Sequence, residues 1–274
     1  MLEIKNWNEI KRLSIEVISF EYDEIIYTRH TNPDGSIGGY VAATATVEET
    51  VFVYDNARVC GNARVCGNAR VYDNARVCGN ARVCGNARVY DNARVYGNAY
   101  VYDNAYVYGN AYVSGNAYVY GNAYVYGNAC VYGNARVCGN ARVCGNARVY
   151  DNARVYGNAR VYGNARVCDN ARVYGNAHVY DNAYVYGNAR VYDNARVYGN
   201  AYVYDGKIKT MIKTIQIFRY CVSITEEFVF IGCQRFKIED IKLITYKETK
   251  AIQHGITQAQ FSILKKMVLL AIKY

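Results

Sequence analysis

The sequence predicts an all-β fold, a single-stranded parallel β-helix with a triangular cross-section. Valine recurs every six residues from Val41 to Val203 without an insertion, and from residue 53 each cycle contains a Gly-Asn or Asp-Asn pair. The chain also has 31 tyrosines and one proline. Valine and tyrosine favour strands, whereas each glycine costs a helix about 1 kcal/mol relative to alanine. A fixed period of this kind predicts a repeat architecture instead of two ordinary domains.

Each six-residue repeat is expected to form a short strand followed by a turn. In one repeat, Ala63 and Val65 face the core, Arg64 and Cys66 face outward, and Gly67-Asn68 turns the chain. Three repeats close a triangle of 18 residues, and stacked triangles place valine over valine, alanine over alanine and asparagine over asparagine. Nine such coils fit between Val41 and Tyr202, which gives a prism roughly 43 Å long at about 4.8 Å per rung.

Both ends depart from the period and are expected to act as caps. We assign residues 1–40 to an N-terminal cap and lead-in, 41–206 to the hexapeptide-repeat shaft, and 207–274 to a small α+β C-terminal cap. In the last segment, 214–224 and 227–236 are predicted strands, and 238–248 and 257–274 are predicted helices, with Thr257 as the cap of the second helix. If this cap covers the open strand edge of the last coil, the chain stays a separate rod. If the edge is open, rods can associate end to end into a fibre.

The termini carry no sign of export or of a membrane span. The first twenty residues mix acidic and basic side chains and lack the apolar core of a signal peptide. The apolar run "MVLLAI" is too short for a span, which needs about 20 residues. We therefore expect a cytoplasmic protein, in a bacterium or a virus-infected host cell, whose cysteines are mostly reduced.

The outward positions are expected to form three rows along the prism, because residues 18 apart lie one above the other. Between residues 53 and 206 there are sixteen arginines and nine aspartates, with no lysine or glutamate. The rows lose arginine at the same height, so two basic bands should flank an aromatic waist from Tyr96 to Tyr132. The first row contains Arg64, Arg82, Tyr100, Tyr118, Arg136, Arg154, Arg172 and Arg190; the second contains Arg70, Arg88, Tyr106, Tyr124, Arg142, Arg160, His178 and Arg196; the third contains Arg58, Arg76, Arg94, Tyr112, Cys130, Arg148, Arg166, Tyr184 and Tyr202.

Stacked guanidinium and phenol groups suggest a surface for an acidic polymer, including non-specific binding of nucleic acid. Arginine would hold the charge, and tyrosine would stack on bases or sugar rings. The candidate polyanion-binding residues are Arg64, Arg82, Arg136, Arg154, Arg172, Arg190, Tyr150 and Tyr156. A simpler interpretation stays open: both residue types are large enough to shield a flat β face and are tolerated there without a ligand.

The hexads "VYGNAR" and "VCGNAR" resemble the hexapeptide repeat of left-handed β-helix proteins. The stretches "DGSIGGYVAATATVEETVFVYDNARV", residues 34–59, and "VFIGCQRFKIEDI", residues 229–241, are similar to a group of phage- and prophage-associated proteins labelled polymer-forming or acyltransferase. The resemblance implies left-handed coiling. It also implies an alternative function, because many left-handed β-helix proteins are trimeric acyltransferases that use a histidine as general base.

The residues give this enzyme alternative little support. The chain has three histidines, His30, His178 and His254, and His178 occupies an ordinary arginine position. The loop that usually interrupts the coils to build an acyl-donor pocket is absent from residues 53–205. We assign no catalytic residue and no cofactor.

The cysteines are expected to reflect drift of a duplicated repeat, since single base changes link Tyr, Cys, Arg and His. Cys60 and Cys78, like Cys66 and Cys84, should lie one rung apart, which is within disulfide range. We predict no metal site, because the chain has no CxxC pair. The sequence therefore favours a non-enzymatic structural or interaction rod, with polyanions, partner proteins or further copies of the chain, as a trimer or lateral assembly, as its possible partners.

Overall fold

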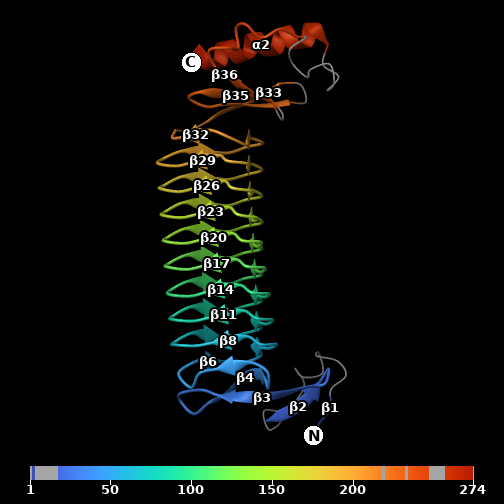
Figure 1. The fold of residues 1–274 in the computed structure, drawn as a ribbon, viewed down its shortest axis with the longest axis vertical. Coiled ribbons are helices and arrows are strands. Elements are labelled where there is room, and N and C mark those ends of the chain that lie inside the picture. The colour runs from blue at the N-terminus through green and yellow to red at the C-terminus, as the bar shows by residue number, and fades with distance from the viewer. Residues whose placement is uncertain are drawn as a thin grey trace.

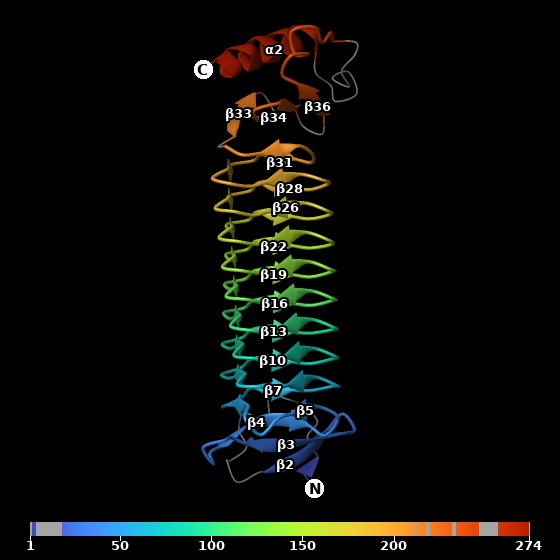
Figure 2. The same ribbon diagram turned by 60° about the vertical axis from the view of Figure 1, so that its left-hand side comes forward.

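The fold is a straight column with a small cap at each end (Figure 1). The computed structural model describes residues 2–3, 18–210, 212–217, 220–231, 234–246 and 257–273. Three flat sheets, here called A, B and C, run the length of the column, and the view turned by 60° shows the same regular stack of coils (Figure 2). This arrangement is a parallel β-solenoid of about nine turns and confirms the predicted fold class.

Most strands of the column contain only two residues, one facing out and one facing in. Sheet A has 13 strands. They are β1 (Leu2–Glu3), β2 (Ser19–Tyr22), β3 (Ile25–Thr31), β4 (Ile37–Ala42), β7 (Arg58–Val59), β10 (Arg76–Val77), β13 (Arg94–Val95), β16 (Tyr112–Val113), β19 (Cys130–Val131), β22 (Arg148–Val149), β25 (Arg166–Val167), β28 (Tyr184–Val185) and β31 (Tyr202–Val203).

Sheets B and C have ten and nine strands. Sheet B contains β5 (Thr46–Val47), β8 (Arg64–Val65), β11 (Arg82–Val83), β14 (Tyr100–Val101), β17 (Tyr118–Val119), β20 (Arg136–Val137), β23 (Arg154–Val155), β26 (Arg172–Val173), β29 (Arg190–Val191) and β32 (Lys207–Ile208). Sheet C contains β6 (Phe52–Val53), β9 (Arg70–Val71), β12 (Arg88–Val89), β15 (Tyr106–Val107), β18 (Tyr124–Val125), β21 (Arg142–Val143), β24 (Arg160–Val161), β27 (His178–Val179) and β30 (Arg196–Val197).

Backbone hydrogen bonds join each coil to the next in a register of 18 residues. The Arg64 N–H donates to the Ala81 carbonyl at 2.9 Å, and the Cys66 N–H donates to the Val83 carbonyl at 3.0 Å. The same pairing recurs along all three sheets, so Arg82 lies directly over Arg64 and Val83 over Val65. Strands this short have too few hydrogen bonds to be stable alone, and neighbouring coils must support one another.

The turns depend on the glycine or aspartate that precedes each asparagine. Gly115 has φ +67°, and aspartates at the equivalent position, such as Asp103, have φ values between 52° and 59°. Glycine adopts this left-handed region without strain, and aspartate is among the residues that tolerate it. The asparagines are not left-handed; instead their side-chain amides stack, as where Asn98 donates to Asn116 at 3.1 Å.

Valine and alanine fill the interior, as the period predicts. From Val51 to Val203 every repeat valine and alanine is fully buried, and they form one continuous cluster. The core is thin, because three valines and three alanines from each coil meet at the axis. Burying one valine contributes about 1.5–3 kcal/mol, so the whole stack is needed for stability.

The N-terminal cap extends sheet A beyond the first coil. Strands β2, β3 and β4 pair antiparallel, and β4 then pairs parallel with β7. Gly38 and Gly39 of β4 cross the first coil so closely that a Cβ atom on Gly38 would lie 1.9 Å from the Val53 carbonyl oxygen. Phe20, Tyr27 and Tyr40 pack below as a small aromatic cluster.

The C-terminal cap is a four-stranded antiparallel sheet, here called sheet D, covered by one helix. Sheet D contains β33 (Lys213–Ile217), β34 (Tyr220–Ile224), β35 (Phe228–Ile231) and β36 (Gln234–Lys237), and helix α2 (Gln258–Lys273) lies across the tip of the column (Figure 1). Phe230 is buried against Ile208 and Ile212 and closes the top of the valine core. The cap contacts the edge strand β31 of sheet A, because the Tyr202 N–H donates to Ser223 Oγ at 3.3 Å.

The sequence-based prediction for this cap is right for the second helix and for the strand character of 214–224 and 227–236, but wrong for the number of strands and for the first helix. Helix α2 begins as expected, since Gln260 N–H donates to Thr257 Oγ1 at 3.2 Å and Thr257 N–H donates to Gln260 Oε1 at 3.0 Å. The strands expected at 214–224 and 227–236 are two hairpins, not two strands.

The helix expected at 238–248 is wrong over residues 238–246, where 238–243 and 246 form turns and 244–245 have no regular structure. Residues 247–248 lie outside the described part. Short-range bonds such as Leu243 N–H to the Asp240 carbonyl, at 2.9 Å, replace a continuous helical ladder there.

Within the described residues, no helix combines the length and the apolar character that crossing a bilayer requires.

We predict that Val119→Ala, in a central coil, lowers the free energy of unfolding by about 2 kcal/mol. The substitution removes two buried methyl groups and leaves a cavity that a rigid stack cannot close. Urea denaturation followed by circular dichroism measures the effect. Val47→Ala is the matched control, because Val47 in the first coil is only half-buried, and its cost should be smaller. Equal costs at the two positions would contradict a core that carries the stability.

Candidate functional site

The outer face of sheet B brings together seven of the eight predicted polyanion-binding residues. Six arginines and two tyrosines form one straight row, in which each residue pairs with the one 18 positions later. We call this the sheet B row: Arg64, Arg82, Tyr100, Tyr118, Arg136, Arg154, Arg172, Arg190 and, one rung further, Lys207. The predicted Tyr156 lies beside it, at the second outward position of its repeat.

Among the described residues, the cations in the upper half of this row have no anionic partner. The described residues contain three ion pairs, of which only the one between Arg64 and Glu48 involves the sheet B row. Arg136, Arg154 and Arg190 are exposed, and Arg172 is half-exposed. Neighbouring guanidiniums one rung apart repel each other by about 1 kcal/mol in water. The upper half of sheet B is therefore a line of unneutralised positive charge.

Several aspartates of the shaft bind the backbone of the next coil and form no ion pair with these arginines in the described residues. Asp169 Oδ2 accepts the Gly187 N–H at 2.9 Å, and Asp91 Oδ2 accepts the Gly109 N–H at 3.0 Å. In each case the carboxylate reaches the turn of the next coil, so its charge stays at the corner of the prism.

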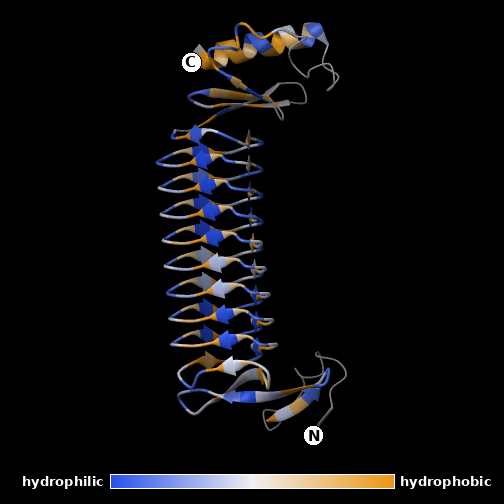
Figure 3. Ribbon diagram, viewed as in Figure 1, coloured by the Kyte–Doolittle hydropathy of each residue, from blue (hydrophilic) through white to orange (hydrophobic). Residues whose placement is uncertain are grey.

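The aromatic waist separates the two basic bands, as predicted. On sheet B the rings of Tyr100 and Tyr118 stack with centroids 4.8 Å apart. Arg82 lies over the first ring at 5.3 Å and Arg136 over the second at 5.5 Å. Sheet C repeats the sandwich with Arg88, Tyr106, Tyr124 and Arg142. The waist appears in Figure 3 as pale strands between blue ones.

A second row of stacked phenols flanks the upper arginines of sheet B. Tyr156, Tyr174 and Tyr192 stack with centroids 4.9 and 5.0 Å apart and nearly parallel planes. Bases in DNA stack at about 3.4 Å, so inserting one between two rings needs about 6.8 Å. A base therefore cannot enter between successive tyrosines of this stack, and a base or sugar ring could contact only its outer surfaces.

Tyr150 is not part of this surface. It lies on sheet A, where it stacks on Tyr132 at 5.0 Å, and its hydroxyl is 3.2 Å from that of Tyr184. The buried Cys168 thiol donates to the same Tyr184 hydroxyl at 3.4 Å. Of the eight candidate residues, Tyr150 is therefore the one that lies on another face, beside Arg148 of sheet A.

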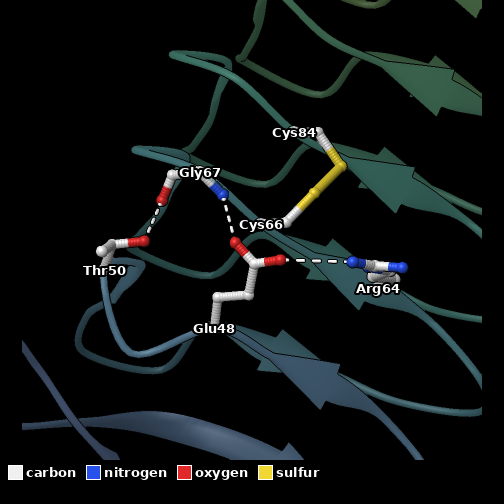
Figure 4. A network of polar contacts seen from close by, with 6 residues as sticks. All are labelled: Glu48, Thr50, Arg64, Cys66, Gly67 and Cys84. Carbon is white, nitrogen blue, oxygen red and sulfur yellow. Dashed lines mark hydrogen bonds and ion pairs between the residues drawn. A yellow bond between two sulfur atoms is a disulfide. The ribbon is translucent and has the colours of Figure 1, made fainter.

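The lower end of the sheet B row is held by a polar network (Figure 4). Glu48 accepts the Gly67 N–H at 2.8 Å and pairs with Arg64 at 3.3 Å, while the Thr50 hydroxyl donates to the Gly67 carbonyl at 2.5 Å. The hydrogen bond from Gly67 and the pairing with Arg64 lower the pKa of Glu48. Side chains of the first coil thus bind the turn above them, and Arg64 is less available to a ligand than the upper arginines.

Two disulfides join the same two coils near this end. Cys60 bonds to Cys78 and Cys66 bonds to Cys84, with Cα atoms 4.5 and 4.6 Å apart. The expectation of reduced thiols is therefore wrong for these four cysteines. Cys130, Cys138, Cys144 and Cys168 are free.

The free thiols include one that lies among carboxylates. Ligand atoms of Asp151, Cys168 and Asp169 all lie within 4.8 Å of one another. These residues do not have CxxC spacing. Cys168 and Asp169 are adjacent in the chain, and Asp151 lies one coil below Asp169. The absence of a CxxC pair therefore does not keep possible ligand atoms apart in this fold.

The histidines do not converge on a common site in the described residues. His30 Nε2 is 2.9 Å from the Val51 carbonyl oxygen. His178 lies edge-on to Tyr162, and burial followed by the charges of Arg160 and Arg196 lowers its pKa, so it is neutral at pH 7. His254 lies outside the described residues.

An open depression of about 400 Å³ lies where the shaft meets the C-terminal cap. Its lining includes Arg190 and Lys207 at the end of the sheet B row, together with Arg235, Asp205 and Glu227. Arg235 is paired with Asp205.

The repeats match the YdcK β-solenoid repeat. Eleven segments match this family model, and together they span residues 51–103, 129–181 and 189–205. No curated protein matches the sequence significantly.

Solved structures with similarity include UDP-N-acetylglucosamine acyltransferases from three bacteria. The Francisella novicida enzyme has a TM-score of 0.35 and 16% identity, over 83% of this chain and 85% of that one. The Moraxella catarrhalis O-acyltransferase has a TM-score of 0.34 and 12% identity, over 85% and 93%. The Campylobacter jejuni enzyme has a TM-score of 0.25 and 13% identity, over 52% and 67%. Scores this low do not bear on the activity of this chain.

We predict that a reductant lowers the free energy of unfolding by about 3 kcal/mol for each disulfide. Each bond closes a loop with a sequence separation of 18 residues, and the entropy removed from the unfolded chain corresponds to that value. Urea unfolding with and without a phosphine reductant measures the difference. The Cys60→Ser/Cys66→Ser variant is the control and should not respond; an equally insensitive native chain would contradict the two bonds.

Tyrosine ionisation should destabilise the column at high pH. A hydrogen bond with Cys138, followed by burial, raises the pKa of Tyr120 to about 12, and Cys144 has the same effect on Tyr126. The unfolded phenol ionises near pH 10, so this contribution to stability is complete below pH 10 and is lost as the pH rises towards 12. Thermal melts between pH 8 and pH 12, with tyrosinate absorbance, test this; a melting temperature constant to pH 12 would contradict it.

Proposed function

We propose that the chain is a non-enzymatic rod that binds linear polyanions along the upper half of sheet B. The observation that supports this most directly is the unbroken line of Arg136, Arg154, Arg172, Arg190 and Lys207, in which no member has an ion pair among the described residues. A linear polyanion lying parallel to the axis would neutralise the repulsion between successive rungs. The phage association suggested by the sequence resemblance is a further proposal.

Charge, not base recognition, is the basis of the proposed binding. The stacked rings of Tyr156, Tyr174 and Tyr192 cannot admit a base between them, and a row of identical rungs offers the same contacts at every height. We therefore expect binding that is independent of sequence and strongly dependent on salt.

The polyanion surface predicts the salt dependence of binding to single-stranded DNA. Five cations give a slope of log K against log salt of about −3.5, and Arg154→Gln/Arg172→Gln should reduce it to about −2. Fluorescence anisotropy with labelled oligothymidine across a salt series measures both slopes, and heparin competition shows whether the surface distinguishes polyanions.

The matched control is Arg148→Gln/Arg166→Gln, which removes the same number of charges at adjacent positions on sheet A. The sheet A row continues into Tyr184 and Tyr202 rather than into further cations, so its slope should stay near that of the unmodified chain. No salt-sensitive binding, or equal effects of the two variants, would overturn the assignment to sheet B.

The alternatives from the sequence analysis remain predictions. Acetyl-coenzyme A in a parallel binding assay tests the acyltransferase alternative, since saturable binding of the thioester in the absence of polyanion binding would favour it. Sedimentation equilibrium tests the trimer and lateral assembly.

A further inference from the structure

The corner between sheets A and B carries one thiol and two carboxylates that converge. Asp151 and Asp169 occupy the same turn position in successive coils, and Cys168 precedes the second of them. The sulfur atom and one oxygen atom from each carboxylate lie within 4.8 Å of one another. The Cys168 side chain is 1% exposed, whereas both aspartates reach solvent. The two carboxylates therefore form the solvent-facing side of this group, and the thiol forms its buried side.

This arrangement occurs at only one of the free cysteines in the described residues. Cys138 and Cys144 occupy the same position of the repeat as Cys168 and are also reduced. The turn residues beside them are glycines in both coils concerned, Gly121 and Gly139 for Cys138 and Gly127 and Gly145 for Cys144. Proximity to carboxylates is thus specific to Cys168 and not a general property of the repeat.

The two carboxylates have capacity for a cation. One oxygen of Asp169 accepts the Gly187 N–H at 2.9 Å, which fixes the side chain and leaves its other oxygen available. Neither aspartate takes part in an ion pair found in the described residues. Two unpaired carboxylates one rung apart repel each other, and a cation between them would remove that repulsion.

We propose that Asp151, Cys168 and Asp169 form a binding site for a thiophilic divalent cation of the zinc type. Zinc binds thiolate sulfur at about 2.3 Å and carboxylate oxygen at about 2.0–2.2 Å, commonly with three protein ligands and a water molecule. Calcium and magnesium take oxygen ligands, so the sulfur selects against them. This site is independent of the polyanion surface.

Metal binding requires only a small rearrangement. Tetrahedral zinc brings its ligand atoms to about 3.5 Å from one another, so ligand atoms that lie up to 4.8 Å apart must approach by up to about 1.3 Å. The thiol proton passes to water as the sulfur binds the cation. The Tyr184 hydroxyl, now 3.4 Å from the sulfur, loses the thiol as a donor and keeps its contact with the Tyr150 hydroxyl at 3.2 Å.

Isothermal titration of the full chain with zinc, and absorption spectroscopy with cobalt(II) as a probe, test the site. We expect one zinc ion bound per chain at micromolar concentration and a sulfur-to-cobalt charge-transfer band. Cys168→Ser should abolish the band, and Asp151→Asn or Asp169→Asn should weaken zinc binding at least about tenfold. Cys138→Ser is the matched control and should bind zinc like the unmodified chain.

A gain-of-site variant keeps the proposal testable if a loss variant misfolds. Gly121→Asp/Gly139→Asp builds the same trio around Cys138, and the turns accept aspartate because Asp103 and Asp193 already occupy the same corner in other coils. We expect this variant to bind a second cation. The proposal would be overturned if the unmodified chain bound no zinc at micromolar concentration, or if Cys168→Ser left the stoichiometry and the cobalt spectrum unchanged.

Discussion

The structure depends on the register of 18 residues in which each coil hydrogen-bonds to the next. A two-residue strand is stable only when the strands above and below are in register, and the thin core accepts only valine and alanine at its inward positions. A shift of one residue would exchange inward and outward side chains. The array from Val41 to Val203 therefore contains no insertion, and every outward position becomes part of a continuous row.

This constraint also determines the chemistry of the surface. Because equivalent positions of successive coils lie one above the other, arginines lie next to arginines. Their electrostatic repulsion therefore adds up along a row. The protein limits it at the waist, where Arg82 and Arg136 end on the faces of Tyr100 and Tyr118, and at the lower end, where Glu48 pairs with Arg64. In the upper half of sheet B, the described residues include neither an ion pair nor a cation–π contact for the arginines above Arg136. We therefore propose a polyanion as the ligand there.

The sequence was informative where the period holds. Residues 18 apart stack in successive coils, and this spacing alone predicts the core, the three sheets, the rows and the waist. It also predicts that Cys60 lies next to Cys78 and Cys66 next to Cys84. The sequence was less informative in the C-terminal cap, where no period exists. No glycine, asparagine or proline marks the break between β33 and β34, and Gly232 is the single such residue between β35 and β36. At the candidate sites, the row follows from the period, and so does the pairing of Tyr150 with Arg148 on sheet A. The sequence analysis missed the trio at Cys168, because its members come together only when the chain is coiled.

The register itself can be tested most directly by introducing one cysteine. Tyr156 lies one coil above Cys138 at the same position of the repeat, so Tyr156→Cys should form a disulfide with Cys138 under mild oxidation, as detected by mass spectrometry of linked peptides. Arg154→Cys, two residues away in the neighbouring row, should leave Cys138 free. A bond from position 156 to Cys144, or an equal yield from both variants, would contradict the 18-residue stack on which the surface and both proposed sites depend.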